Sequence, residues 1–395
     1  MNWIQQIIDE TEEFESPSRY IYWAALSAIS AVCRKNLYLE RYTHQLYPNI
    51  FVLLIGESGL KKGYPISLSR RLVEYVHCTR VIAGRYSIPA AIRELGKVYT
   101  LSKDEFLKEA YGFFCNSELD SALVKDDDSF SVLTDLYDCH WNPKWNNWLK
   151  SGDSELTDPY LVMLGGSNED NLKGAIPGKA VHGGFIARTF VILEEEARTV
   201  NPLTKPPKIT VNVAQLSKHL MQISNLKGEF TYGEGAAQYF EDWYREFRTN
   251  RPRDPTGTLS RIDDSVLKIA MLISLGKRLD LILTIEDIAE SIERVFECLP
   301  GMRKVFMGTG KAELAEKTAI IIKAIMKQPE LKIKRSKLIG DGWKWGDYDA
   351  HDVDKIVDTL TQANAILVHR NGTDTTYELK KDIAEAYRKF KSEVQ

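Results

Sequence analysis

The stretch NIFVLLIGESGLKKGYPISLSRRLVEYV, residues 49–76, decides the fold that we expect for this chain. Its apolar run at 51–55 predicts a buried β-strand, and the segment from 65 to 77 has the pattern of a helix. Between them lies a glycine-containing loop, 56–63, next to a helix N-terminus, which favours bound phosphate. This order is typical of a phosphate-binding loop, although glycines also occur in ordinary strand-to-helix turns.

The loop departs from the standard pattern G-x-x-x-x-G-K-[ST] at its metal-facing end. Lys62 takes the position of the lysine that reaches the β- and γ-phosphates, but Lys61 replaces the second glycine and Gly63 replaces the Mg²⁺-binding hydroxyl. Water, Ser58 or Ser67 would have to substitute for that hydroxyl. We expect ATP to contact Gly56, Glu57, Ser58, Gly59, Leu60, Lys61, Lys62, Gly63 and Tyr64, with Mg²⁺ held less tightly than usual.

Size and composition are those of an ordinary multidomain globular protein. The chain has 395 residues, of which 44% are hydrophobic and 27% charged, and its formal net charge is −3. No global basic excess indicates nucleic acid, so such binding would need local patches. The five cysteines have no CxxC spacing, which favours a reducing cytoplasm over a disulfide framework or zinc site. The longest apolar runs are too short for a membrane helix, so we expect no membrane partner.

Four apolar runs separated by helical patterns predict a parallel α/β sheet covered on both faces. The runs lie at 50–55, 111–115, 158–168 and 188–195. Helices are predicted before the first run, at 2–15 and 19–35, and a mostly helical region follows the proline-rich stretch 201–210. The expected organisation is an N-terminal helical segment at 1–42, a nucleotide-binding core at 43–200, a helical lid at 201–310 and a separate unit at 311–395.

The last unit has the pattern of a winged helix. Three helical segments, 313–328, 334–342 and 350–364, precede two strands around an Asn-Gly turn, which is a strong hairpin signal. The unit is only slightly basic, and the third helix carries several aspartates, a poor face for a DNA groove. We therefore expect it to bind protein, or to touch DNA through Lys334, Arg335 and Arg370.

Two polar residues follow predicted strands in positions where they could act on a nucleotide. Glu118 follows the second apolar run, where a carboxylate can polarise an attacking water; the alternative is a buried strand that ends in a solvated glutamate. Ser117 stands where a Mg²⁺-binding Asp is usual, and Asp120 is out of register. Asn168 follows the third run and could hold that water, although Asn after a strand is often only turn chemistry.

Two arginines complete the series. Arg188 stands behind two glycines at the start of a strand, where it could reach a neighbouring subunit's γ-phosphate as an arginine finger. The alternative is a surface arginine that opens a strand. Arg261 stands at the start of an apolar helix in the lid, where a helix-end salt bridge is the simpler interpretation.

Taken in order, these motifs resemble the AAA+ ATPases, and more narrowly the MCM-like branch and the P-loop proteins found beside primases in phages and mobile elements. The matching words are YPNIFVLLIGESGLKKG, FFCNSEL, DPYLVMLGGSNEDNL, GGFIARTFVI and RIDDSVLKIAMLI, which cover roughly residues 20–280. The resemblance implies the Walker A lysine role for Lys62, the Walker B glutamate role for Glu118, sensor 1 for Asn168, the arginine finger for Arg188 and sensor 2 for Arg261.

The same resemblance implies a homo-oligomeric ring, commonly of six subunits, with each nucleotide between one subunit's loop and the next subunit's arginine. Single-stranded or forked DNA would pass through the ring, and a primase or polymerase would be a further partner. The candidate DNA grip lies at 139–156, where Trp145 stands between Lys144 and Lys150. Aromatic and basic side chains together suit single-stranded nucleic acid, although tryptophans that pack a surface hairpin onto the core would look the same.

The leading hypothesis from the sequence is therefore an ATP-dependent DNA helicase or translocase of a phage or mobile element. A second hypothesis is a nucleotide-binding but slow or inactive adaptor, such as a replication loader or initiator, because two Mg²⁺ ligands are replaced. A third is a DNA-binding regulator built on an inactive ATPase fold.

Overall fold

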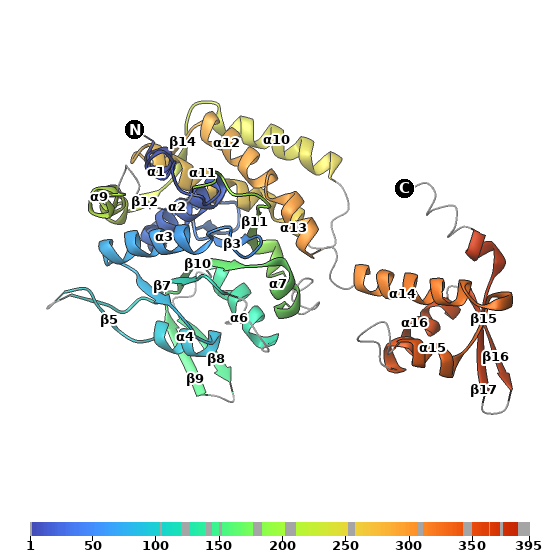
Figure 1. The fold of residues 1–395 in the computed structure, drawn as a ribbon. Helices are drawn as coiled ribbons and strands as arrows, with labels where there is room; N and C mark the ends of the chain where they lie inside the picture. Colours follow the sequence, from blue (N-terminus) through green and yellow to red (C-terminus); the bar gives the residue numbers. More distant parts are fainter. Residues whose placement is uncertain are drawn as a thin grey trace. The chain divides into compact units, whose positions relative to one another are not determined.

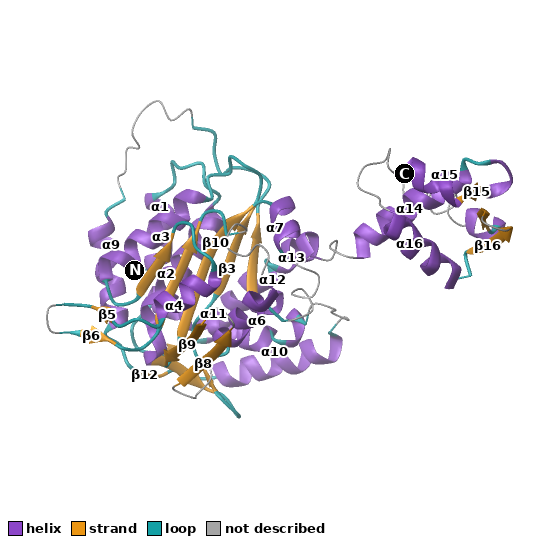
Figure 2. Ribbon diagram, turned by 90° about the horizontal axis from the view of Figure 1, so that it is seen from below, coloured by secondary structure: helices purple, strands orange, loops and turns teal. Residues whose placement is uncertain are grey.

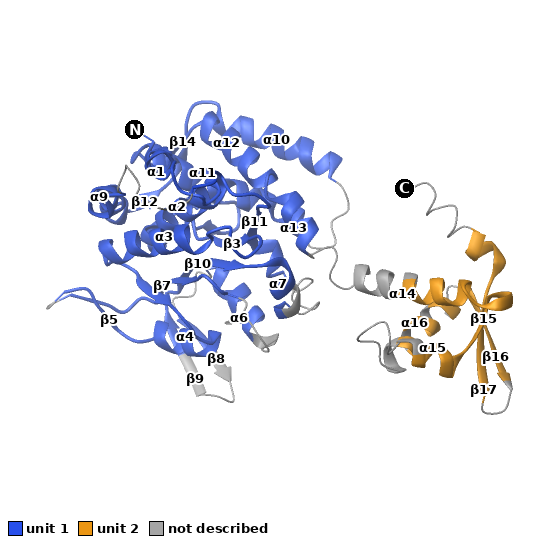
Figure 3. Cartoon of the chain, in the orientation of Figure 1, with its two compact units in different colours: residues 1–306 blue, residues 307–395 orange. Residues whose placement is uncertain are grey.

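The computed structural model has two compact units, residues 1–306 and 307–395, which are described separately (Figure 1, Figure 3). The first unit contains three of the four segments expected from the sequence, and the boundary lies close to the predicted position 311. The structure describes residues 2–102, 105–119, 127–139, 144–149, 152–176, 184–201, 211–251, 257–306, 311–342, 350–362, 364–371 and 374–385.

A five-stranded, all-parallel sheet forms the centre of the first unit, as the apolar runs predict (Figure 2). The strand order is β11-β3-β10-β7-β4, so the first strand along the chain lies between the last two. The edge strand β4 was not predicted, because its short run Arg-Val-Ile-Ala includes a charged residue. The bounds are β3 (Phe51–Ile55), β4 (Arg80–Ala83), β7 (Tyr111–Asn116), β10 (Tyr160–Ser167) and β11 (Thr189–Leu193).

Side chains of the central strands enter two separate cores, one on each face of the sheet. In β3, Val52 and Leu54 belong to one core, while Phe51, Leu53 and Ile55 belong to the other. Strand side chains alternate between faces, so a strand covered by helices on both sides is apolar throughout. This explains why β3 and β10 appear in the sequence as continuous apolar runs.

In the described part of the chain, five inner helices form the first core together with side chains of two outer helices, and α2 among the five is buried almost all round. Helices α9 and α11, expected as part of a lid, pack in this same core with the N-terminal helices. The predicted segments 1–42 and 201–310 thus share one core with the sheet. These helices are α1 (Trp3–Glu10), α2 (Ser18–Cys33), α3 (Gly63–Val76), α9 (Val213–Ser224) and α11 (Ile262–Lys277).

Four shorter helices cover the other face: α4 (Ile88–Leu95), α6 (Asp127–Tyr137), α7 (Glu169–Ala175) and α13 (Leu299–Phe306). Helix α13 lies at the end of the region 201–310, which was expected to be a helical lid. It approaches β11 so closely that a Cβ at Gly301 would lie 2.9 Å from Leu193 Cβ. Outside α11 lie α12 (Ile285–Phe296) and, against it, α10 (Ala236–Asn250).

Several small antiparallel or mixed pairings surround the main sheet. Residues 87–110 contain α4 and, after it, the hairpin β5–β6. A second hairpin, β8–β9, connects α6 with β10. The bounds are β1 (Leu37–Glu40), β2 (Gln45–Leu46), β5 (Tyr99–Thr100), β6 (Phe106–Leu107), β8 (Lys144–Leu149), β9 (Gly152–Thr157), β12 (Gly228–Glu229), β13 (Thr231–Tyr232) and β14 (Ile282–Leu283).

Within its described residues, the second unit has the helices α14, α15 and α16 and a three-stranded antiparallel sheet of order β15-β17-β16. Its own core includes Ile321, Ile333 and Tyr377. All three predicted helices and the Asn-Gly hairpin are present, whereas the three-residue strand β15 was not predicted. The bounds are α14 (Lys311–Met326), β15 (Lys332–Lys334), α15 (Arg335–Gly342), α16 (Ala350–Gln362), β16 (Ile366–Asn371) and β17 (Asp374–Leu379).

Because the two units have separate cores, we expect a chain that ends at Phe306 to fold with the unfolding temperature that the first unit has in the full chain. A matched chain that ends at residue 298 removes Met302 and Val305, which are 4% and 0% exposed. Loss of such buried side chains costs about 2–4 kcal/mol each. Thermal unfolding followed by circular dichroism tests both. Equal stability of the two shortened chains would contradict this account of α13.

Candidate functional site

The loop 56–63 lies between the carboxyl end of β3 and the N-terminus of α3, as its sequence predicts. Gly56 is required sterically, because a Cβ there would lie 2.6 Å from Tyr20 Oη and 2.7 Å from the Glu194 carbonyl oxygen. Gly59 has φ +108°, which L side chains rarely adopt, and Lys61 has φ 51°. A Cβ at Gly63 would meet nothing within 4 Å, so packing does not explain the loss of the hydroxyl there.

The ammonium of Lys62 points back into the loop instead of into solvent. Its Nζ donates hydrogen bonds to the carbonyl oxygens of Gly56, at 2.7 Å, and Glu57, at 2.8 Å. Partial burial lowers the pKa of Lys62. A cation surrounded by neutral acceptors at a helix N-terminus suits an incoming anion, because the anion can supply the missing countercharge.

The N-terminal segment encloses this loop, which the sequence analysis did not foresee. Ser16 Oγ donates to the Lys61 carbonyl oxygen at 2.8 Å, and Lys61 Nζ lies 3.5 Å from Glu15 Oε2. The rings of Phe14 and Tyr64 stack with their centroids 4.4 Å apart. The loop is therefore held in shape by residues about 45 positions away in the sequence.

Glu118 and Asn168 follow β7 and β10 and lie at the same edge of the sheet as the loop, because carboxyl ends of parallel strands share an edge. The Glu118 side chain is exposed, and its backbone N–H donates to Asn116 Oδ1 at 2.9 Å. Asn168 is the N-cap of α7, where its side chain accepts from Asn171 N at 2.7 Å. The turn-chemistry interpretation of Asn168 thus holds, and its Nδ2 group is not used by the cap.

A cavity of about 390 Å³ adjoins the loop at this edge, and most of its charged side chains are acidic. Within the described part of the chain, no three His, Cys, Asp or Glu side chains are placed to hold a metal ion. A Mg²⁺ ion that arrives with ATP is held largely by phosphate oxygens and water, so this finding concerns a resident metal only. The cavity is lined by Gly56, Glu57, Asn168, Glu169, Asp170, Leu193, Glu194, Glu195 and Lys304.

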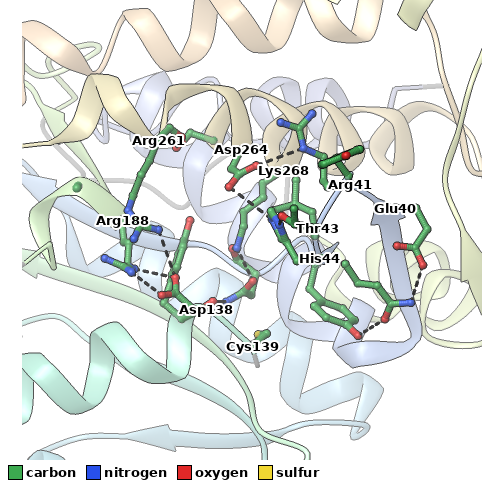
Figure 4. Close-up of a pocket in the computed structure, with 18 residues that line it drawn as sticks. Glu40, Arg41, Thr43, His44, Asp138, Cys139, Arg188, Arg261, Asp264 and Lys268 are labelled. Carbon is green, nitrogen blue, oxygen red and sulfur yellow. Dashed lines mark hydrogen bonds and ion pairs between the residues drawn. The ribbon is translucent and has the colours of Figure 1, made fainter. Parts of the chain in front are cut away.

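Arg188 and Arg261 lie at the opposite edge of the sheet, where the strands begin. Arg188 immediately precedes β11, and Arg261 precedes α11. The five residues of β11 span about 16 Å at roughly 3.3 Å per residue, so the sheet separates Arg188 from the loop of its own chain. The two arginines share a second cavity of about 810 Å³ (Figure 4).

Arg188 is only 7% exposed and makes a two-pronged pair with Asp138. Its Nε donates to Asp138 Oδ1 at 2.8 Å, its Nη2 donates to Oδ2, and its Nη1 donates to the Gly184 carbonyl oxygen at 3.0 Å. Arg261 Nη1 approaches the same carboxylate at 3.5 Å. Arg188 is therefore not a surface arginine, and Arg261 does make an ion pair next to a helix start.

A buried lysine, Lys268, projects from α11 into the same cavity (Figure 4). Its Nζ donates to Asn49 Oδ1 at 2.6 Å and to the Asn49 carbonyl oxygen at 3.1 Å, and it lies 3.9 Å from the centroid of the Tyr137 ring. Burial lowers the pKa of Lys268 to about 8. On the other side of the cavity, Arg41 pairs with Asp263 at 3.0 Å and Asp264 at 3.5 Å.

The sequence analysis did not single out Asp138 or Lys268. Asp138 stands in a polar stretch for which no element was predicted, and Lys268 is one lysine within an apolar helix. The position of Lys268 could have been recognised from the sequence. A charged residue in the middle of a helix that is otherwise apolar all round must be buried with partners.

The candidate nucleic-acid residues have protein partners in the structure. Trp145 is half-buried against the second core, and its Nε1 donates to Asp135 Oδ2. Lys144 pairs with Glu155 at 3.1 Å on the facing strand, and Lys150 lies outside the described residues. The Trp145 side chain would thus have to leave α6 before a base could stack on it. This agrees with the interpretation that the tryptophan packs the hairpin onto the core.

In the second unit, the basic cluster is largely neutralised by acidic neighbours. Lys334 Nζ lies 2.8 Å from Asp374, and Arg335 makes a two-pronged pair with Asp354 at 2.9 and 2.6 Å. Arg370 is exposed on β16. Asp354 of α16 thus holds a basic side chain of α15.

No protein-family model matches the chain, and a search of curated proteins finds no significant match. Among the described residues, none of the helices has the length and apolar character that crossing a membrane requires. The five cysteines are buried and free.

We expect the free energy of unfolding to rise with pH between about 8 and 10.4 because of Lys268. In this window the unfolded chain keeps the proton, while the folded chain, with its pKa of about 8, has lost it. Relative to Lys268→Met, the wild type should gain about 2 kcal/mol between roughly pH 7.5 and 9.5 in urea titrations. Lys277→Met is the matched control, since ion pairs with Glu290 and Asp287 raise the pKa of Lys277 despite burial. If the difference in the free energy of unfolding between wild type and Lys268→Met did not change with pH, Lys268 would stay charged in the folded chain.

Proposed function

We propose that this protein binds ATP at the loop 56–63 and works as an ATP-dependent DNA translocase or helicase, with a second copy completing each nucleotide site. The observation that carries the proposal is the position of the Lys62 ammonium, which lies inside the loop on the carbonyl oxygens of Gly56 and Glu57. The phosphates of ATP would take over this cation. A loop between a buried parallel strand and a helix N-terminus supports that role.

The roles of the other residues follow from where they lie. Glu118 and Asn168 share the loop's edge of the sheet, where Glu118 would activate the attacking water and the Asn168 amide would orient it. Mg²⁺, when bound with ATP, would neutralise phosphate charge; Gly63 supplies no hydroxyl for it. The AAA+ assignment of the core and the winged-helix assignment of the second unit belong to this proposal.

The proposal requires a neighbouring copy, because Arg188 and Arg261 cannot reach the loop of their own chain. Both arginines line one cavity, so they would meet the same phosphate, and that phosphate would be held by another copy's loop. Contacts of this head-to-tail kind generate rings when they close, and a ring of six is the expected form. DNA would contact Lys144, Trp145 and Lys150 of the hairpin β8–β9, with a primase or polymerase as a further partner.

A slow or inactive adaptor is the second candidate, and a specific observation favours it. The cavity beside the loop is lined by five carboxylates, Glu57, Glu169, Asp170, Glu194 and Glu195, with Lys304 as its basic side chain. Repulsion of phosphate by these groups, together with Gly63 and Ser117 in place of Mg²⁺ ligands, would favour slow turnover. Detectable ATP binding without measurable hydrolysis would support this candidate.

Lys62→Ala should abolish ATP binding, measured by calorimetry in the presence of Mg²⁺, because it removes the cation inside the loop. The matched control is Lys61→Ala, which removes the adjacent lysine, whose ammonium faces Glu15 at 3.5 Å. This control should retain binding within about threefold, since exposed ion pairs contribute about 0–1 kcal/mol. Equal loss in both variants, or full binding by Lys62→Ala, would sink the nucleotide-site assignment.

Mixing two inactive variants should restore ATP turnover if the arginines act between copies. Lys62→Ala copies lack a working loop but supply arginines, and Arg188→Ala copies supply the loop. Random assembly of equal amounts gives a working pair at about a quarter of the interfaces. Steady-state ATPase activity of the mixture should therefore reach about a quarter of the wild-type value. A mixture no more active than its components would exclude a neighbouring arginine.

A further inference from the structure

Asp138 lines the cavity that Arg188 and Arg261 share, which we call the arginine cavity. It has no role in the function proposed above. It directly follows α6, which ends at Tyr137. Both of its carboxylate oxygens accept from Arg188, and Arg261 lies 3.5 Å from Oδ1 (Figure 4). The only strong countercharge that the structure describes for the nearly buried Arg188 guanidinium is thus this carboxylate.

The carboxylate stays ionised although it is partly buried. Burial raises the pKa of Asp138, but the hydrogen bonds and charge of Arg188, with the charges of Arg261 and Lys268, hold the pKa below its usual value. The guanidinium groups of Arg188 and Arg261 therefore both approach one internal anion, and Lys268 adds positive charge nearby. The arrangement has the electrostatic character of an occupied anion site, with the protein's own carboxylate as the occupant.

A guanidinium binds a carboxylate and a phosphate through the same two parallel N–H groups. Arg188 already uses Nε and Nη2 on Asp138. A phosphate that is to receive this two-pronged contact must therefore displace the Asp138 carboxylate, and every measured affinity for that phosphate would include the loss of the internal pair.

The end of α6 is connected to the hairpin β8–β9 as well. Asp135, three residues before Asp138, accepts from Trp145 Nε1 on β8. The same helix end thus holds Arg188 through one aspartate and the proposed DNA-binding hairpin through another. Movement of Asp138 away from Arg188 would act on a segment that directly contacts the hairpin.

We propose that Asp138 is an internal counter-ion that occupies the arginine pair until the terminal phosphate of an adjoining copy's nucleoside triphosphate replaces it, and that its release shifts the hairpin β8–β9. This regulation rests on the proposed function. It makes Asp138 a positioning residue that acts through Arg188. The hairpin β8–β9 then shifts when the neighbouring copy carries a nucleotide, whereas assembly without a nucleotide leaves it in place.

The test uses the mixed assemblies of Lys62→Ala and Arg188→Ala copies, with Asp138→Asn placed in one kind of copy at a time. In the copies that supply the arginines, Asp138→Asn should raise kcat/KM for ATP by about tenfold, the factor for a loss of about 1.4 kcal/mol of competing interaction. In the copies that supply the loop, the gain should be absent, since their Arg188 is already removed.

Asp264→Asn in the arginine-supplying copies is the matched control, because it removes a carboxylate that pairs with Arg41 in the same cavity. A gain from this control equal to that from Asp138→Asn would overturn the proposal, as would a gain that does not depend on which copy carries Asp138→Asn. A fall to the level of Arg188→Ala alone would show that Asp138 holds Arg188 in its working position, and would also overturn it.

A second measurement does not depend on ATP turnover. An inactive mixture of Lys62→Ala and Arg188→Ala copies would contradict the proposed function, and this measurement would still test the role of Asp138. Hydrogen exchange of the full chain without nucleotide should speed up in β8 and β9 for both Asp138→Asn and Arg188→Ala, but not for Asp264→Asn. Thermal unfolding confirms that each variant is folded. Unchanged exchange in β8 and β9 would overturn the link between Asp138 and the hairpin.

Discussion

All five strands of the central sheet run in the same direction, and the placement of the candidate nucleotide-site residues depends on this shared polarity. The loop 56–63, Glu118 and Asn168 follow strands and therefore gather at one edge, while Arg188 precedes a strand and lies at the other. A single chain thus presents the two halves of the proposed site at opposite edges of the sheet. The halves can meet only between copies, which is why the proposed function is inseparable from assembly.

The second constraint is the need to compensate buried positive charge. Lys62, Arg188 and Lys268 are each removed from water to some degree, and each is surrounded by acceptors of a different kind. Lys62 has two backbone carbonyls, Lys268 has one asparagine and an aromatic face, and Arg188 has a carboxylate. The first arrangement leaves a net positive charge that attracts an anion, whereas the last is already neutralised. This difference separates a ligand cradle from a site that must first be opened.

The helices that were expected to form a separate helical lid pack with the core instead. Their packing thus overrides the domain boundaries that the sequence motifs suggested. Helices α9 and α11 share the first core with α2 and α3, and Lys268 of α11 bonds to Asn49 at the start of the strand that leads to the loop. The cavity that Arg188 and Arg261 share is lined by the end of α6, the residues just before β11, α11 and the segment 40–47, and it is a product of that shared core.

The sequence by itself determined the strands and helices whose patterns are local. A fully apolar run must be buried on both faces, so β3, β7, β10 and β11 and the parallel α/β class were predictable, as were the Asn-Gly hairpin and the position of the loop. Short elements whose burial is mixed, such as β4, β15 and the hairpin β5–β6, were missed, because their stability comes from neighbours. Only the tertiary structure decided that Asp138 neutralises Arg188 and that Trp145 bonds to Asp135. These pairs join residues that no local pattern connects, and electrostatic partners are set by distance in space.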